Sequence, residues 1–105
     1  MTLDPEDSKI ITLARAARAR TGAREGAAVR DETGRTYSAT NVALTSLTLS
    51  ALQVAVAMAI SSGAASLEAA ALVTAGEPAA DDDAALVREL GGTLLVAGPD
   101  GQVRG

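Results

Sequence analysis

The segment from Thr48 to Ser62 predicts a helix that is apolar on nearly every side, and this feature limits the folds open to the chain. Its apolar run, from Leu49 to Ile60, is interrupted only by Ser50 and Gln53. A membrane-spanning helix needs about 20 apolar residues, so this shorter run predicts a helix inside a protein and no membrane partner. Such a helix must be covered on all sides, either by the rest of the chain or by another subunit.

The length of 105 residues favours one domain, residues 1–105, around one core. The apolar residues are mostly Ala, Val and Leu, with one Tyr, no Phe and no Trp. Small side chains bury little surface, and each Å² contributes only about 25 cal/mol. This core must rely on many close contacts and would gain from a partner's surface, so a homo-oligomer is expected.

The formal net charge of -4 and the single aromatic residue make nucleic acid an unexpected partner, because such binding needs a basic face and stacking rings. Arginines nevertheless gather in the first third of the chain, at Arg15, Arg18, Arg20, Arg24, Arg30 and Arg35. They are interpreted as a solvated helix face and exposed strand ends, with a contact site for an acidic partner or RNA as the alternative. The acidic N-terminal segment, residues 1–7, does not resemble a signal peptide, which predicts a cytoplasmic protein.

Apolar periodicity and turn signals predict an α/β chain with the element order αββαβαββ. Asp4 and Pro5 are typical of a helix start, and Gly34 suits the turn of a hairpin. One aspartate within residues 81–83 is expected to cap the third helix. The expected helices and strands cover residues 5–22, 27–31, 36–40, 48–62, 69–74, 84–90, 93–97 and 102–104.

Several short motifs resemble those of cytidine deaminases. Gly26-Ala27-Ala28-Val29 is similar to the family's V-G-A-A-L, and Gly34-Arg35 is similar to its D-G-R turn. Asn41-Val42 followed by Leu47-Thr48-Leu49 resembles N-V-E-N-(x)n-L-T-x-C-A-E, which carries a zinc ligand and the catalytic glutamate. Glu89-Leu90-Gly91-Gly92 resembles the E-x-G-G that follows P-C-x-x-C. The resemblance implies a three-layer α/β/α fold with a mixed sheet of about five strands.

The groups that carry the deaminase reaction are missing, because the chain contains no cysteine and no histidine. Carried over along the motifs, the cysteine positions fall at Ser50, Ala80 and Asp83, and the catalytic glutamate position falls at Leu52. Asn41 keeps the position that contacts the ribose. We therefore expect vestigial active-site positions with no metal and no cofactor. Zinc lowers the pKa of bound water to about 7 and a glutamate moves the protons, so their loss predicts no deamination by this mechanism.

Three functions stay open at this stage. The first is a non-catalytic cytidine deaminase-like protein that acts through protein contacts and self-associates as a dimer or tetramer, since oligomers of the family pack around the apolar helix. The second is a nucleoside- or nucleotide-binding pseudoenzyme in which Asn41 holds the sugar. The third is a hydrolase that uses a divalent ion at Glu77, Asp81, Asp82 and Asp83. A Ser-His or Cys-His nucleophile is excluded by composition.

Overall fold

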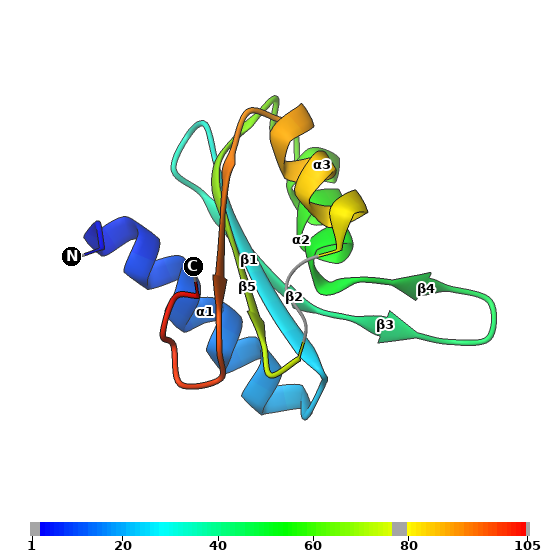
Figure 1. Ribbon diagram of the computed structural model, residues 1–105. Coiled ribbons are helices and arrows are strands. Elements are labelled where there is room, and N and C mark those ends of the chain that lie inside the picture. The colour runs from blue at the N-terminus through cyan, green and yellow to red at the C-terminus, as the bar shows by residue number, and fades with distance from the viewer. Residues whose placement is uncertain (1–2, 77–79, 105) are drawn as a thin grey trace.

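The computed structural model describes residues 3–76 and 80–104, which form a mixed α/β fold (Figure 1). The helices are α1 (Pro5–Thr21), α2 (Ala51–Ser61) and α3 (Asp81–Glu89). The strands are β1 (Glu25–Asp31), β2 (Thr36–Thr40), β3 (Val42–Ala43), β4 (Thr48–Leu49), β5 (Leu67–Thr74) and β6 (Thr93–Ala97). The expected order of the helices and main strands is confirmed. The structure also contains the short strands β3 and β4, and the strand expected at 102–104 is present only as a single bridge.

The main sheet has the strand order β2-β1-β5-β6. β1 runs antiparallel to both of its neighbours, whereas β5 and β6 run parallel. The strand expected at 102–104 is present only as an antiparallel bridge between Ala97 and Val103. A tight turn precedes this bridge, because the amide of Gly98 donates to the carbonyl of Gln102 at 3.0 Å. The prediction of a mixed sheet is confirmed.

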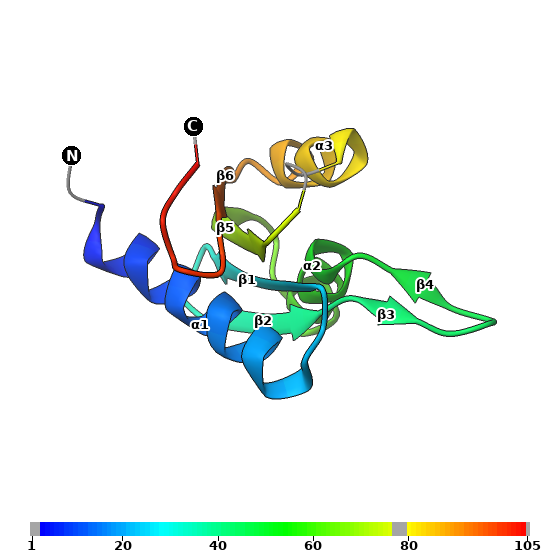
Figure 2. The same cartoon turned by 60° about the horizontal axis from the view of Figure 1, so that its bottom comes forward.

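The helices cover both faces of this sheet. α1 lies on one face, and α2 and α3 lie on the other, as Figure 2 shows. Two core clusters result, one between the sheet and α1 that includes Ile10 and Ala28, and one that includes Val29, Leu52 and Val87. Ala28 and Val29 are neighbours in β1 and enter opposite clusters, as the alternation of a strand requires. The predicted three-layer architecture is confirmed.

Small residues allow α1 to approach β1 closely. A Cβ atom on Gly26 would collide with the carbonyl oxygen of Ala14 and would lie 2.9 Å from the Cβ of Arg18. Ala14, Ala17 and Gly26 are all buried at this contact. Dispersion attraction falls steeply with separation, so close approach compensates in part for the small area that each alanine buries. The glycine of the first strand is needed for this packing.

The first helix begins and ends as the sequence predicts. The carboxylate of Asp4 accepts a hydrogen bond from the amide of Glu6 at 2.8 Å, and Pro5 occupies the first turn. Gly22 ends the helix with a φ of 68°, in the left-handed region that glycine tolerates. These local signals mark both ends of α1, and its buried face then packs against the sheet.

The starts of the other two helices differ from expectation. α2 begins at Ala51, because Ser50 and Gln53 form a capping box. α3 begins at Asp81, and its N-cap Ala80 makes no side-chain hydrogen bond. The prediction of an aspartate cap was therefore wrong for α3. Its three aspartates occupy the first turn, where the helix dipole favours negative charge.

The connection before α2 contains a hairpin that the sequence did not predict. β3 and β4 pair antiparallel, with Val42 opposite Leu49 and Ala43 opposite Thr48. The hairpin extends away from the main sheet in both ribbon views (Figures 1 and 2). Thr48 and Leu49 therefore belong to a strand, where a first helical turn was expected. In the described part of the chain, no helix is long and apolar enough to cross a membrane.

A buried aspartate organises the turn between β1 and β2. Asp31 is 2% exposed, and its carboxylate accepts hydrogen bonds from the amide and hydroxyl of Thr33, the amide of Arg35 and the hydroxyl of Tyr37, at 2.7–3.0 Å. These bonds, those from Thr33 foremost, hold the pKa of Asp31 below its ordinary value. Burial, followed by the contact with Asp31, raises the pKa of the Tyr37 phenol. The turn is therefore built around an ionised carboxylate.

Candidate functional site

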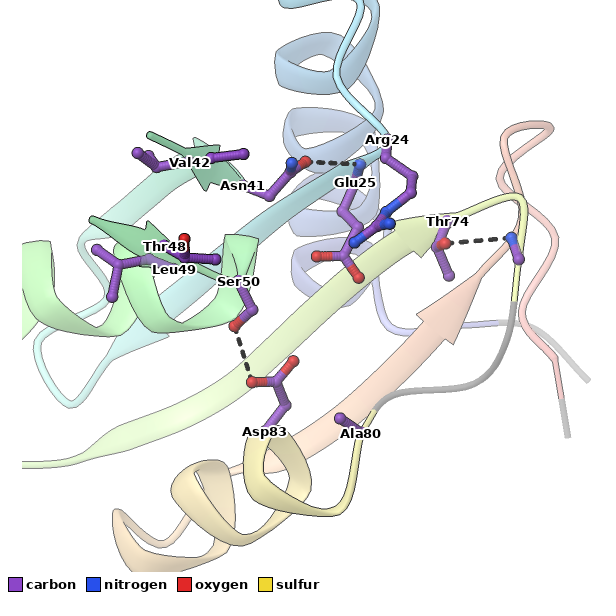
Figure 3. Close-up of a pocket in the computed structure, with 12 residues that line it drawn as sticks. Arg24, Glu25, Asn41, Val42, Thr48, Leu49, Ser50, Thr74, Ala80 and Asp83 are labelled. Carbon is purple, nitrogen blue, oxygen red and sulfur yellow. Dashed lines mark hydrogen bonds between the residues drawn. The ribbon is translucent and has the colours of Figure 1, made fainter. Parts of the chain in front are cut away.

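A cavity of about 570 Å³ opens where the β3–β4 hairpin meets the starts of α2 and α3 and one edge of the main sheet (Figure 3). β1 begins and β5 ends at this edge, because the two strands run antiparallel. The lining residues are Arg24, Glu25, Asn41, Val42, Ala43, Thr48, Leu49, Ser50, Thr74, Gly76, Ala80 and Asp83. A concave site of this size with a few polar groups is the usual setting for binding a small molecule.

Two of the predicted site residues are joined by a hydrogen bond. Ser50, the N-cap of α2, donates from its hydroxyl to Oδ1 of Asp83 in the first turn of α3 at 2.8 Å (Figure 3). The same hydroxyl accepts from the amide of Gln53 at 3.1 Å. Asp83 is only 4% exposed. This hydrogen bond thus joins the start of α2 to the start of α3 beside the cavity.

Ala80 and Leu52 have different positions relative to this pair. Ala80, the residue before α3, lines the same cavity as Ser50 and Asp83. Leu52 does not line the cavity, since its side chain is 0% exposed and packs in the core with Val29 and Ala55. The structure therefore brings together the residues at the three predicted cysteine positions and places the residue at the predicted glutamate position in the core.

Asn41 also lies in the cavity wall, at the junction of β2 and β3. Its side-chain carbonyl Oδ1 accepts a hydrogen bond from the amide of Glu25 at 3.0 Å (Figure 3). This bond orients the Asn41 side chain, so that the carbonyl is engaged with the protein and the amide nitrogen remains for other contacts. The predicted ligand-binding residue is therefore in the cavity, with one of the two acceptor positions of its carbonyl already used.

Sequence reasoning missed Glu25, the first residue of β1. Its carboxylate points into the cavity (Figure 3), and its Oε1 accepts a hydrogen bond from the amide of Ala51 at 3.4 Å. The expected strand started at Ala27, so Glu25 was assigned to the preceding loop. The signal available in the sequence was a charged residue directly before the small and apolar run from Gly26 to Val29, which the structure buries.

The acidic segment does not form a metal site in the described structure. Asp81 and Asp82 are exposed, whereas Asp83 faces Ser50. Glu77 lies outside the described residues. Across residues 3–76 and 80–104, no group of three or more His, Cys, Asp or Glu side chains is placed to hold a metal ion. Residues 81–83 therefore form a charged helix start with one inward-facing carboxylate, that of Asp83.

A family model described as cytidine deaminase-like matches residues 3–102. The chain belongs to the cytidine deaminase-like family. Solved cytidine deaminases have a similar structure. That of Burkholderia pseudomallei is 25% identical with a TM-score of 0.76, over 91% of this chain and 87% of that one. That of Mycobacterium tuberculosis is 29% identical with a TM-score of 0.72, over 96% and 90%.

The cytidine deaminase of Mycobacterium leprae is 23% identical with a TM-score of 0.71, over 95% of this chain and 94% of that one, and supports the fold alone. No curated protein matches the sequence significantly. The resemblance in short motifs, the family match and the fold agree. The cytidine deaminase-like assignment therefore rests on the whole chain and does not depend on any single motif.

Side chains at the positions that resemble zinc ligands do not fit zinc. Zinc sites in proteins are built from thiolate, imidazole and carboxylate groups, usually with three or four protein ligands. Ser50, Ala80 and Asp83 offer a hydroxyl, a methyl group and one carboxylate, and the carboxylate is already bonded to the hydroxyl. This member of the cytidine deaminase-like family therefore carries a hydroxyl, a methyl group and a carboxylate at the positions that resemble zinc ligands.

Proposed function

We propose that this chain is a non-catalytic member of the cytidine deaminase-like family that self-associates and acts through protein contacts. The hydrogen bond of 2.8 Å between Ser50 and Asp83 carries this proposal. It joins two of the three positions that resemble cysteine ligands, and the third, Ala80, has no donor atom in its side chain. A hydroxyl and one carboxylate make a poor zinc site, which argues against an activated water at this place.

The position that resembles the catalytic glutamate supports the same proposal. Leu52 has no group that can exchange protons, and its side chain is fully buried in the core. A positioned general acid or base typically contributes about 10²- to 10⁴-fold to a rate. Glu25 is the other carboxylate near the start of α2, but it comes from β1 and accepts from the Ala51 amide. The proton-transfer role is therefore left without an equivalent residue.

Exposed apolar side chains support self-association. α2 contains no charged residue, and its Met58 and Ile60 are 41% and 43% exposed. In the connection between β3 and β4, Leu44 and Leu47 are 63% and 47% exposed. Large apolar side chains gathered on protruding or uncharged elements are typical of protein interfaces. We assign the outer side of α2 and this hairpin as contact surfaces of a dimer or tetramer.

Deamination assays with cytidine, in the presence of added zinc, test the catalytic part of the proposal. We expect no turnover by the natural chain. The matched comparison is a variant with Ser50→Cys, Ala80→Cys and Asp83→Cys, which supplies three thiolates for zinc and whose folding is checked by circular dichroism. Cytidine turnover by the natural chain above the uncatalysed rate would overturn this part, whatever the variant does.

Sedimentation velocity at micromolar concentration tests the self-association. We expect a dimer or tetramer for the natural chain and a shift towards monomer for Met58→Asp. Ala19→Asp is the matched control, because Ala19 is also exposed but lies on α1, on the opposite face of the sheet. A natural chain that sediments as a monomer contradicts the proposal, as does an equal response of the two variants.

A nucleoside-binding pseudoenzyme is the second candidate, because the cavity of about 570 Å³ persists and Asn41 lines it. The hydrogen bond from the Glu25 amide weakens this candidate, since it occupies one acceptor position of the Asn41 carbonyl and restricts how the side chain can turn towards a sugar hydroxyl. Thermal-shift measurements with nucleosides and nucleotides separate the two functions. A shift with cytidine that Asn41→Ala removes would favour the pseudoenzyme.

A further inference from the structure

Asp83 is a buried charge with few hydrogen bonds. It is 4% exposed, yet Ser50 is the one described residue that donates to it, and this bond reaches Oδ1 alone. Oδ2 of Asp83 has no hydrogen-bond partner among residues 3–76 and 80–104. It is also not fully buried, because Nη1 of Arg30 is the one described side-chain atom that is both fully buried and without a partner. Oδ2 is therefore open to the cavity that Asp83 lines. A buried carboxylate in this state is stabilised by a cation that can reach it.

Glu25 adds a second negative charge to the same cavity. Its carboxylate points inward from β1 (Figure 3), and the single donor it meets in the described structure is the Ala51 amide at the long distance of 3.4 Å. Arg24 lines the cavity as well, but it forms no ion pair within 4.0 Å with any described acidic group. The cavity is thus lined by two carboxylates and one exposed guanidinium, that of Arg24.

The geometry favours an ammonium group over a divalent metal ion. Calcium takes six to eight oxygen ligands and magnesium needs near-ideal octahedral geometry, and the described residues place no third acidic side chain beside these two carboxylates to complete such a shell. An ammonium group needs only a few acceptors, because it carries three N–H donors. Val42 and Leu49 also line the cavity and offer apolar surface to a short carbon chain.

We propose that this cavity binds a small organic ammonium ion, with Oδ2 of Asp83 and the carboxylate of Glu25 as its acceptors. The ligand class is a primary amine that is protonated at neutral pH and carries a short apolar chain. The inference is independent of the proposed function, because a self-associating protein can hold such a ligand or lack it. It also differs from nucleoside binding, which requires neutral base and sugar groups to be recognised.

Titration of the natural chain with n-butylammonium, followed by backbone amide NMR, tests the inference. We expect saturable shifts at the amides of Glu25 and Ala51, and no comparable shifts with n-butanol, which has the same carbon chain without the charge. Asp83→Asn should weaken binding by about tenfold or more, because a charge-assisted hydrogen bond is lost. Asp82→Asn is the matched control and should leave binding within about twofold, since Asp82 is exposed on the same helix turn.

Two further variants sharpen the assignment. Glu25→Gln should also weaken binding of n-butylammonium, whereas Arg24→Gln should strengthen it, because a competing positive charge is removed from the rim. The inference is overturned if n-butanol binds as well as n-butylammonium, or if Asp82→Asn weakens binding as much as Asp83→Asn. Saturable shifts with magnesium or cytidine but not with n-butylammonium would also overturn it. The comparison of n-butylammonium with n-butanol uses the natural chain, so it tests the inference even if Asp83→Asn fails to fold.

Discussion

The two buried aspartates, Asp31 in the β1–β2 turn and Asp83 beside the cavity, have similar exposure and very different surroundings. The carboxylate of Asp31 accepts four hydrogen bonds from its own hairpin, whereas that of Asp83 accepts one from the described residues, donated by Ser50. Burial of a charge is tolerated when donors satisfy it, so the number of donors separates a structural carboxylate from an available one. Asp31 stabilises the fold, and Asp83 stays open to a ligand.

The largest expected effect comes from placing a carboxylate at position 52, in the core. Leu52→Glu should prevent folding or destabilise the chain by more than about 4 kcal/mol, because the new charge would be buried without donors. Leu52→Met, the control, should cost less than about 1.5 kcal/mol. Urea unfolding followed by circular dichroism measures both. A stable Leu52→Glu protein would show that the cavity reaches this position.

Removal of the satisfied carboxylate should have the next largest effect. Asp31→Ala leaves its donors in the turn without an acceptor, so we expect the Tm to fall by roughly 5–15 °C. Asp82→Ala removes the same charge from an exposed position and should change the Tm by no more than about 2 °C. Differential scanning calorimetry compares the two variants. Equal Tm values would show that Asp31 stabilises the fold no more than an exposed aspartate does.

The pH dependence of stability gives an independent test of Asp31. Its pKa is lower in the folded chain than in the unfolded chain, so its stabilising contribution is present above the ordinary aspartate range. The contribution is lost as the pH falls through the lowered folded value. The Tm difference between the natural chain and Asp31→Asn should therefore shrink as the medium becomes acidic. A difference that grows on acidification would contradict this assignment.

Loss of the single donor to Asp83 should have a moderate effect. Ser50→Ala removes the cap of α2 together with the hydrogen bond to Asp83, which should cost about 1–2 kcal/mol. Ser50→Thr keeps the hydroxyl and should recover most of this loss. Chemical unfolding of the two variants is the measurement. If Ser50→Ala is as stable as the natural chain, the link between α2 and α3 has no energetic importance.

The smallest effect is expected for Asp83→Asn. The side-chain carbonyl of asparagine can still accept from Ser50, and the cost of burying a charge disappears, so stability should change by no more than about 0.5 kcal/mol. Asp31→Asn should cost clearly more in the same unfolding experiment. A large loss for Asp83→Asn would mean that Asp83 is a structural carboxylate like Asp31.

Local signals predicted the first part of the fold well, because they need no tertiary context. Asp4, Gly22 and Gly34 correctly placed the ends of α1 and the first turn. The resemblance to cytidine deaminases supplied Ser50 and Asp83, and the structure brings both to one cavity. For Asp4, Gly22 and Gly34 the residue type carries the signal, through a cap or a positive φ, whereas Ser50 and Asp83 were located by their positions along the motifs.

The remaining features depend on contacts between distant segments. β3 and β4 have two residues each, too short for alternation of apolar residues to show. Glu25 lies in the cavity because β1 pairs with β5 in one particular register, with Glu25 opposite Thr74. Nothing in the sequence around Glu25 encodes that pairing. The same reason explains why the resemblance alone did not show that Leu52 is enclosed by the core.

The strand order of the main sheet also has a consequence for how the chain folds. α1, β1 and β2 are consecutive, so their contacts close only short loops and can form early. β1 then waits for β5, which follows the hairpin and α2 in the sequence, before its second edge is paired. Until that happens, one edge of β1 has no partner strand, although α2 can already pack against β1 and β2. During synthesis, this interval is when the chain is most vulnerable to aggregation.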